Sequence, residues 1–151
     1  MTLLAVMDTL IQPRDFDSAT EALLSACHLP ISDLSGSSDV LLFGHVSGDT
    51  LAGVVGLEMH GANALLRSLA VTKSHRSNGL GAALVSCAEQ QAAAHGANAV
   101  YLLTTTADQF FERRGYVHIN RDEAPAAIAS TSQFSGLCPS SSAFMVKWLG
   151  G

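Results

Sequence analysis

Residues 69–81 carry the sequence LAVTKSHRSNGLG, in which a short apolar strand runs into a glycine-containing turn. Apolar residues at helical spacing begin directly after the turn and continue to His95. In such a turn backbone N–H groups converge on an anion, and the amino end of the helix adds the positive end of its dipole. Gly79 and Gly81 lack a Cβ and let a phosphate approach the backbone, while Arg76 adds charge. The stretch therefore predicts a pyrophosphate-binding turn.

The turn matches neither of the two better-known phosphate loops. Leu84 stands where a GxGxxG loop needs its last glycine, and the segment has no Gly-Lys-Ser/Thr ending. It resembles instead the cofactor motif of the GNAT N-acetyltransferase superfamily, an Arg/Gln-x-x-Gly-x-Gly/Ala turn preceded by a Leu-x-Val strand, here Leu69-Ala70-Val71. The resemblance implies acetyl-CoA as the cofactor and acetyl donor.

The rest of the chain predicts an α/β (α+β) domain. Runs at 40–46, 50–59 and 64–71 predict a three-stranded antiparallel meander. Ala99 to Leu103 predict a strand parallel to 65–71, because one helix connects the two. The other predictions are a strand at Thr2 to Met7, a helix from Phe16 to Cys27 opened by Pro13 and Asp15, a loop from Leu29 to Val40, a helix from Ala107 to Arg114 with caps among Thr104 to Thr106, a helical piece at Pro125 to Ala129, and strands at Val117 to Asn120 and Ala143 to Leu149.

A second superfamily region follows at the expected separation. Thr104, Ala107, Phe110-Phe111 and Gly115-Tyr116 stand at the spacing of the usual Asn, Ala, Leu/Phe-Tyr and Gly-Phe. The resemblance implies a mixed, mostly antiparallel sheet, flanked by helices, whose central parallel strands splay around the cofactor. Unpaired backbone in the first of these strands would pair with the pantetheine arm and stabilise the oxyanion. The cofactor-binding residues it implies are Leu69, Ala70, Val71, Arg76, Ser77, Asn78, Gly79, Leu80, Gly81, Ala82, Thr104, Phe110 and Phe111.

A narrower resemblance covers most of the chain. The stretches at 53–58, 65–69, 101–107 and 133–139 are similar to arsenic-resistance N-acetyltransferases. This similarity implies a role in arsenic tolerance, with an amine-bearing arsenical as one acceptor, and it leaves the acceptor's identity open. A protein or peptide N-acetyltransferase, and a non-catalytic acyl-CoA or arsenic-binding sensor, are the alternative functions.

The proton chemistry is where the superfamily pattern fails. Many members place a general-acid Tyr four residues before the Gly of the Gly-Phe pair, and that position here is Phe111, which cannot donate a proton. Tyr116 is the candidate acid, with core packing as the alternative role. Glu58, near the end of a strand beside the cofactor strand, is the candidate base that deprotonates the acceptor ammonium. The alternative for Glu58 is a solvated or ion-paired carboxylate, and His60, two residues later, is a further catalytic candidate.

Acceptor-binding residues are predicted around Arg67, which shares a strand face with Leu65, Leu69 and Val71 in regular alternation. An Arg among apolar neighbours needs a partner, either Glu58 or an Asp, or the carboxylate of an amino-acid-like acceptor. The predicted substrate-binding set is Arg67, Ser68, Thr105, Thr106, Gln133 and Phe134. Cys138, in the same polar-aromatic stretch, is a candidate thiol for trivalent arsenic.

Composition limits the remaining possibilities. The 151 residues suit a single domain, 1–151, and 48% hydrophobic residues suffice for a core. A net charge of −5 with only eight Lys and Arg argues against nucleic-acid binding. We expect no membrane span, no secretion signal, no metal site and no disulfide, since the three cysteines are far apart without CxxC pairing. A cytoplasmic protein with a small-molecule amine as partner is predicted, and the superfamily resemblance allows a homodimer.

Overall fold

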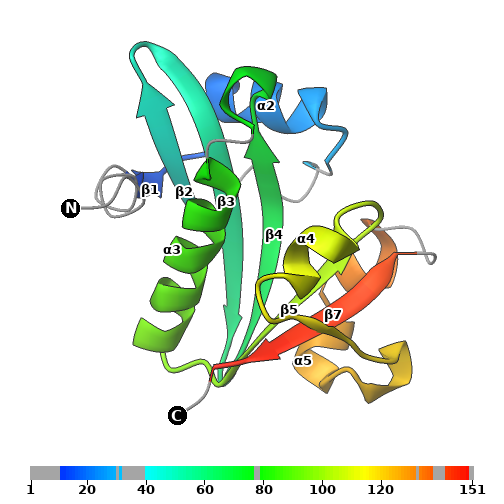
Figure 1. Ribbon diagram of the computed structural model, residues 1–151. Coiled ribbons are helices and arrows are strands. Elements are labelled where there is room, and N and C mark those ends of the chain that lie inside the picture. Colours follow the sequence, from blue (N-terminus) through cyan, green and yellow to red (C-terminus); the bar gives the residue numbers. More distant parts are fainter. Residues whose placement is uncertain are drawn as a thin grey trace.

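The computed structural model describes residues 11–29, 31, 40–76, 79–131, 133–137 and 142–149. Within these residues seven strands form one sheet in the order β1-β2-β3-β4-β5-β7-β6, in which β4 and β5 are parallel and the other neighbours antiparallel (Figure 1). The strands are β1 Ile11–Arg14, β2 Val40–Ser47, β3 Thr50–His60, β4 Asn63–Val71, β5 Ala99–Thr104, β6 Val117–His118 and β7 Ala143–Trp148. The helical elements are α2 Ser18–Ala26, α3 Leu80–Ala94, α4 Asp108–Glu112, α5 Ala126–Ala129, the 3-10 turns η1 Lys73–His75 and η2 Arg121–Glu123, and the π-turn η3 Gln133–Leu137. The mixed α/β sheet predicted from the sequence is confirmed.

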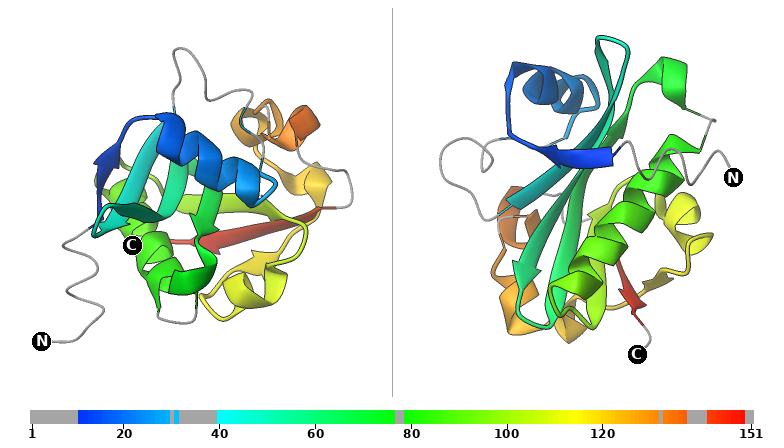
Figure 2. Two further views of the ribbon diagram at one scale, coloured as in Figure 1. Left: turned by 90° about the horizontal axis from the view of Figure 1, so that it is seen from above. Right: turned by 90° about the vertical axis from the view of Figure 1, so that its left-hand side faces the viewer.

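Helices cover both faces of the sheet (Figure 2). On one face, α3 and α4 pack over the largest core cluster, which includes Leu57, Leu84 and Tyr116. On the other face α2 packs over Leu42 and Val54, while Ile128 of α5 joins a separate cluster with Leu65 and Phe144. This second face is thus covered at two places by two different elements. None of the described helices has the length and apolar character needed to cross a membrane.

Strands β4 and β5 pair only at their beginnings. Their register comprises three pairs, ending at Leu65 with Tyr101. Beyond these pairs β4 runs on to Val71 and β5 to Thr104 along diverging directions (Figure 1). The β4 backbone from Arg67 to Val71 therefore has a side without ladder hydrogen bonds to β5. This is the splayed parallel pair that the sequence resemblance implies.

A β-bulge interrupts β4 at the beginning of this divergence. Val54 pairs with Ala70 and Gly56 with Arg67, so Ser68 and Leu69 together oppose Val55 of β3. Ser68 has a positive φ of 58°, an uncommon conformation for a residue with a side chain. The extra residue shifts the alternation, so Leu69 and Val71 pack toward α3 whereas Arg67 meets Glu58 on the other face. Grouping Arg67 with Leu69 and Val71 on one face was therefore wrong, because regular alternation cannot anticipate a bulge.

Two further predictions need correction. Pro13 lies inside strand β1 and not at a helix start, which is possible because β1 is an edge strand of the sheet formed by the described residues. Helix α2 begins after Asp17, whose side chain accepts a hydrogen bond from the Thr20 N–H. None of Thr104 to Thr106 is the N-cap of α4, which is Ala107. The predicted strand at Thr2 to Met7 and most of the loop from Leu29 to Val40 lie outside the described residues.

Candidate active site

The glycine turn leads into α3 in the geometry that an anion site requires. Gly79 is the N-cap of α3 with φ of +89°, a left-handed conformation that favours glycine, and its helix has no side-chain cap. The first N–H groups of a helix have no acceptor within the helix itself, so the Gly81 and Ala82 N–H groups suit an anion at this end of α3. Ser77 and Asn78, also predicted to bind the cofactor, lie outside the described residues. Leu80 and Ala82 belong to the same first turn, and the Leu80 side chain is buried in the core.

Arg76 holds a positive charge beside this turn. Its Nε donates to the carbonyl oxygen of Val71 over 3.1 Å, and its Nη2 lies 3.9 Å from the Sγ of Cys27 at the end of α2. The side chain is exposed, so the guanidinium can meet a phosphate without being uncovered first. The carbonyl contact joins the end of β4 to the turn and fixes where the charge lies.

The two phenylalanines of α4, Phe110 and Phe111, lie in different environments. A Cβ added to Gly81 would lie 3.4 Å from the Phe110 ring, at ordinary van der Waals distance, so this ring lies over the first turn of α3. The Arg114 guanidinium carbon lies 4.4 Å above the centre of the same ring. Phe111 instead is buried in the core, edge-to-face with both Phe110 and Tyr116. Phe110 thus lies beside the anion turn, whereas Phe111 lies in a packing position, and its cofactor contact stays a prediction.

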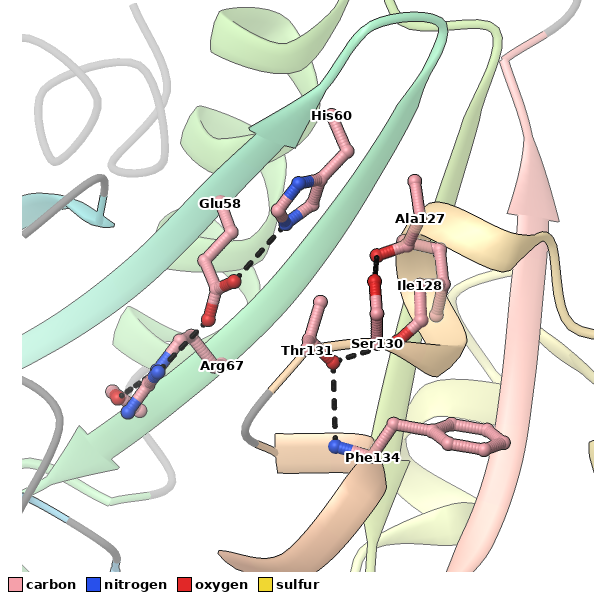
Figure 3. Close-up of polar contacts among 9 residues, drawn as sticks. Glu58, His60, Arg67, Ala127, Ile128, Ser130, Thr131 and Phe134 are labelled. Atoms are coloured by element: carbon pink, nitrogen blue, oxygen red, sulfur yellow. Dashed lines mark hydrogen bonds and ion pairs between the residues drawn. The ribbon is translucent and has the colours of Figure 1, made fainter.

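Glu58 and Arg67 form a buried ion pair on the face that α2 and α5 cover (Figure 3). Nη1 of Arg67 lies 2.8 Å from Oε2 of Glu58, and Nε2 of His60 lies 3.0 Å from Oε1. Each carboxylate oxygen thus has its own partner. The pair lies where β4 leaves β5, since Glu58 is opposite Leu65 in the β3–β4 register and Leu65 is the last residue of β4 that pairs with β5. The ion-paired alternative for Glu58 and Arg67 is confirmed.

The remaining predicted acceptor residues are only partly brought together. Ser68 is buried, and its Oγ accepts from Arg67 Nε over 3.1 Å, so the bulge residue and the ion pair form one unit. Phe134 of η3 packs edge-to-face on Phe144, and its backbone N–H donates to Oγ1 of Thr131. Thr105 and Thr106 are exposed beyond β5. Thr104 accepts the Ala107 N–H at Oγ1 over 3.0 Å. The backbone of Gln133 lies in η3, and Cys138 lies outside the described residues.

Tyr116 lies in the core that faces α3. Its hydroxyl donates to Oε2 of Glu89 over 3.0 Å, and Oε1 of the same carboxylate accepts from Lys147 Nζ over 3.0 Å. Burial, and after it the negative charge of Glu89, raise the pKa of the Tyr116 hydroxyl far above its usual range. This geometry supports the packing alternative, and the role of general acid stays a prediction.

Coenzyme A fits the residues present. The helix start without a side-chain cap at Gly79 and the exposed guanidinium of Arg76 suit a pyrophosphate. The open side of β4 offers N–H and C=O groups to an amide-bearing arm. These features lie at consecutive positions along one strand–turn–helix unit, as a long linear cofactor would require.

Sequence reasoning missed two polar groupings. The contact between Glu89, Tyr116 and Lys147 joins residues 27 and 58 positions apart, and no local pattern indicates it. Asp108, Glu112 and His118 bring their ligand atoms within 4.8 Å of one another, although no metal-ligand grouping was expected. The spacing of Asp108 and Glu112 on one helix face was the available signal, and the 2.8 Å contact of His118 with Glu112 is an exposed ion pair.

Comparison with known proteins agrees with this geometry. Residues 7–116 match the family model described as acetyltransferase (GNAT) family. An uncharacterised N-acetyltransferase from Chlorobaculum tepidum is 40% identical over 63 residues, which cover 42% of this chain and only 40% of that protein. A match to arsenic-resistance proteins is not among these findings.

Solved structures share the fold. An N-acetylglutamate synthase from Neisseria gonorrhoeae, complexed with coenzyme A and N-acetyl-glutamate, has a TM-score of 0.71 and 20% identity over 93% of this chain and 35% of its own. A Klebsiella pneumoniae protein described as an acyl-CoA N-acyltransferase has a TM-score of 0.73 and 20% identity, covering 92% of this chain and 96% of its own. At this identity the likeness shows the fold alone.

Proposed function

Because the chain belongs to the acetyltransferase (GNAT) family, we propose that it transfers an acetyl group from acetyl-CoA to a primary amine of a small molecule. The observation that carries this proposal is the Glu58–Arg67 pair, buried where β4 and β5 diverge. An oriented carboxylate next to the opening can take a proton from an amine held there. The acyl transfer is direct, in a ternary complex, and no enzyme nucleophile is needed.

The donor side of the proposal uses the turn and the open edge of β4. The Gly81 and Ala82 N–H groups of the first turn of α3 and the Arg76 guanidinium would hold the pyrophosphate. Backbone groups from Leu69 to Val71 would hold the pantetheine arm as an added strand would be held. When bound, acetyl-CoA supplies the thioester-activated acetyl group. A backbone N–H of the same segment would stabilise the oxyanion that forms during attack.

The acceptor side is organised around Glu58. We infer that Arg67 fixes this carboxylate, because its side chain is fully buried and already bonded to Glu58 and Ser68. Binding an acceptor carboxylate through Arg67 would require the guanidinium to leave this pair. In this proposal the hydroxyl groups of the exposed Thr105 and Thr106 donate hydrogen bonds to an amino-acid-like acceptor, an arsenical included. The support for an arsenical is the sequence resemblance, and N-acetyl-glutamate in the Neisseria synthase is a related amino-acid ligand.

In this proposal water protonates the leaving thiolate. Phe111 occupies the position of the usual Tyr and is buried, and the Tyr116 hydroxyl is bonded to Glu89. A thiol has an ordinary pKa near 8.5, so a coenzyme A thiolate is a modest base and leaves without a dedicated acid. The cytoplasmic location and the homodimer predicted from the sequence are part of the proposal and have no direct support in the structure.

One assay tests the proposal. The purified chain is incubated with acetyl-CoA and a panel of amino acids, arsenical and phosphinic amino acids and polyamines, and the release of free thiol is followed. We expect amine-dependent release with at least one small amine and acetylation of that amine, measured by mass spectrometry. Acetyl-CoA binding without turnover on any amine would favour a sensor instead, and turnover on peptides alone would favour a protein acetyltransferase.

A further inference from the structure

The Glu58 carboxylate lies between a fully buried group and a partly exposed one. The exposed fraction of the side chain is 0% for Arg67, 10% for Glu58 and 26% for His60. The three therefore form a row that runs from the interior toward solvent along β3 and β4 (Figure 3). An acceptor bound against Glu58 would cover the small part of the carboxylate that water still reaches.

A base in this position must lose its proton before the next turnover. Arg67 cannot take it, because a guanidinium has donors only and is not deprotonated in proteins. His60 can, because the unprotonated nitrogen of a neutral imidazole accepts a proton. Among the side chains that the structure describes, Arg67 and His60 are the ones bonded to the Glu58 oxygens.

We propose that His60 carries the acceptor's proton from Glu58 to water, so that the active site has a built-in proton exit. This inference rests on the proposed function, with Glu58 as the base. His60 acts through Glu58 and touches neither substrate nor cofactor, and it is therefore a relay and positioning residue.

The relay balances in three steps. The attacking ammonium gives one proton to the Glu58 carboxylate, which becomes a neutral carboxylic acid while the amine gains its lone pair. Once protonated, the acid is the donor across the 3.0 Å contact and passes its proton to Nε2 of a neutral His60 whose ring proton is on Nδ1, giving a carboxylate and an imidazolium. The imidazolium then turns toward solvent and releases the Nε2 proton to water, which restores the neutral ring with its proton on Nδ1. Each turnover thus moves one proton and leaves Glu58, His60 and Arg67 as they began.

Position explains why His60 suits this task. It is the last residue of β3, beside the turn at Gly61, and shares a strand face with Glu58 because the two are two residues apart. The β3–β4 ladder continues to His60, which pairs with Asn63, so the imidazole is carried by a regular strand and not by a loose loop. The ring is therefore carried beside the carboxylate, and its side chain is 26% exposed.

The test compares two His60 variants of the full chain, with acetyl-CoA and the amine that turns over fastest in the panel above. In His60→Gln the side-chain amide can hydrogen-bond to Glu58 but cannot take up and release a proton. We therefore expect kcat to fall by about 10- to 100-fold with the KM for acetyl-CoA unchanged. In His60→Ala a similar loss should be partly restored by imidazole in the buffer. His95→Ala, which removes an exposed histidine at the end of α3, is the matched control and should keep the wild-type rate.

Two results would overturn the relay. A wild-type kcat in His60→Gln would mean that the side chain only holds Glu58, and a slow His60→Ala that imidazole leaves unchanged would mean the same. Thermal unfolding of both variants shows that they are folded. If the wild-type chain acetylates no amine at all, the proposed function fails and the relay with it, whereas turnover that is insensitive to His60 ends the relay alone.

Discussion

Two carboxylates on opposite faces of the sheet have nearly the same partners and different surroundings. Glu58 accepts from Arg67 and contacts His60, while Glu89 accepts from Lys147 and Tyr116, and in both groups each oxygen has its own partner within 3.0 Å. Glu89 belongs to α3, and its partner Tyr116 lies in the main core. The Glu58 group lies beside the bulge of β4, where the parallel strands separate.

In the proposed mechanism, position and proton mobility, rather than local chemistry, separate the catalytic carboxylate Glu58 from the structural carboxylate Glu89. The Tyr116 hydroxyl is buried, with a pKa raised far above neutral, so its proton stays in place at any physiological pH. His60 is partly exposed, and a neutral imidazole can accept a proton and release it to water. The Glu89 group can therefore stabilise the fold, whereas the Glu58 group can also turn over a proton.

The largest effect is expected from removing the charge of Glu58, and a much smaller one from removing that of Glu89. Glu58→Gln should lower kcat by about 100-fold or more, because the amide cannot accept the amine's proton, and should leave acetyl-CoA affinity unchanged. Glu89→Gln is the matched control and should keep kcat within about twofold, since no reacting atom lies near it. Thiol-release kinetics and calorimetric titration with coenzyme A measure the two quantities. Equal rates in wild type and Glu58→Gln would remove Glu58 as the base.

A second prediction separates donor binding from proton transfer. Gly79→Val places a β-branched side chain at φ of +89° in the anion turn and should weaken coenzyme A binding by about tenfold or more, because the first turn of α3 must rearrange. Gly61→Val is the control, with φ of +67° and equally open space, located in the β3–β4 turn away from α3. It should lose stability and keep donor affinity. Unchanged affinity in Gly79→Val would contradict the phosphate-turn assignment.

The sequence predicts the structure of a region well when the residues of that region are contiguous in the chain. The donor unit occupies one strand, turn and helix, so the pattern of residues 69–81 predicts the order of these elements, while the left-handed conformation of Gly79 is seen only in the structure. The acceptor side depends on register. The bulge at Ser68 moves Arg67 to the face opposite Leu69, and only strand pairing reveals it. The partners of Glu89 come from distant segments, which the alternation of apolar residues cannot identify.

A third prediction tests whether Tyr116 is structural. Tyr116→Phe should lower the free energy of unfolding by about 1.5 kcal/mol, because a partly buried Glu89 oxygen loses its donor, and should keep kcat within about twofold. Urea unfolding and thiol-release kinetics measure these effects. A fall in kcat of tenfold or more, with acetyl-CoA affinity retained, would instead identify Tyr116 as the general acid that the sequence allows.

The smallest effect concerns the helix that covers the Glu58 face. The Thr20 backbone N–H, then the Thr20 hydroxyl and the Arg14 charge, hold the pKa of Asp17 below its usual value at the start of α2. A carboxyl whose pKa is lower in the folded state stabilises the fold above its unfolded pKa of about 3.9, and this stabilisation disappears as the pH falls through the folded pKa. Asp17→Ala should therefore cost about 0.5–1 kcal/mol at pH 7, as other lost N-caps do, and the gap to wild type should close below about pH 4. Asp15→Ala, an exposed carboxyl two residues earlier, is the control for general charge effects, and a gap that persists undiminished at pH 3 would mean that the cap acts through packing and not through its charge.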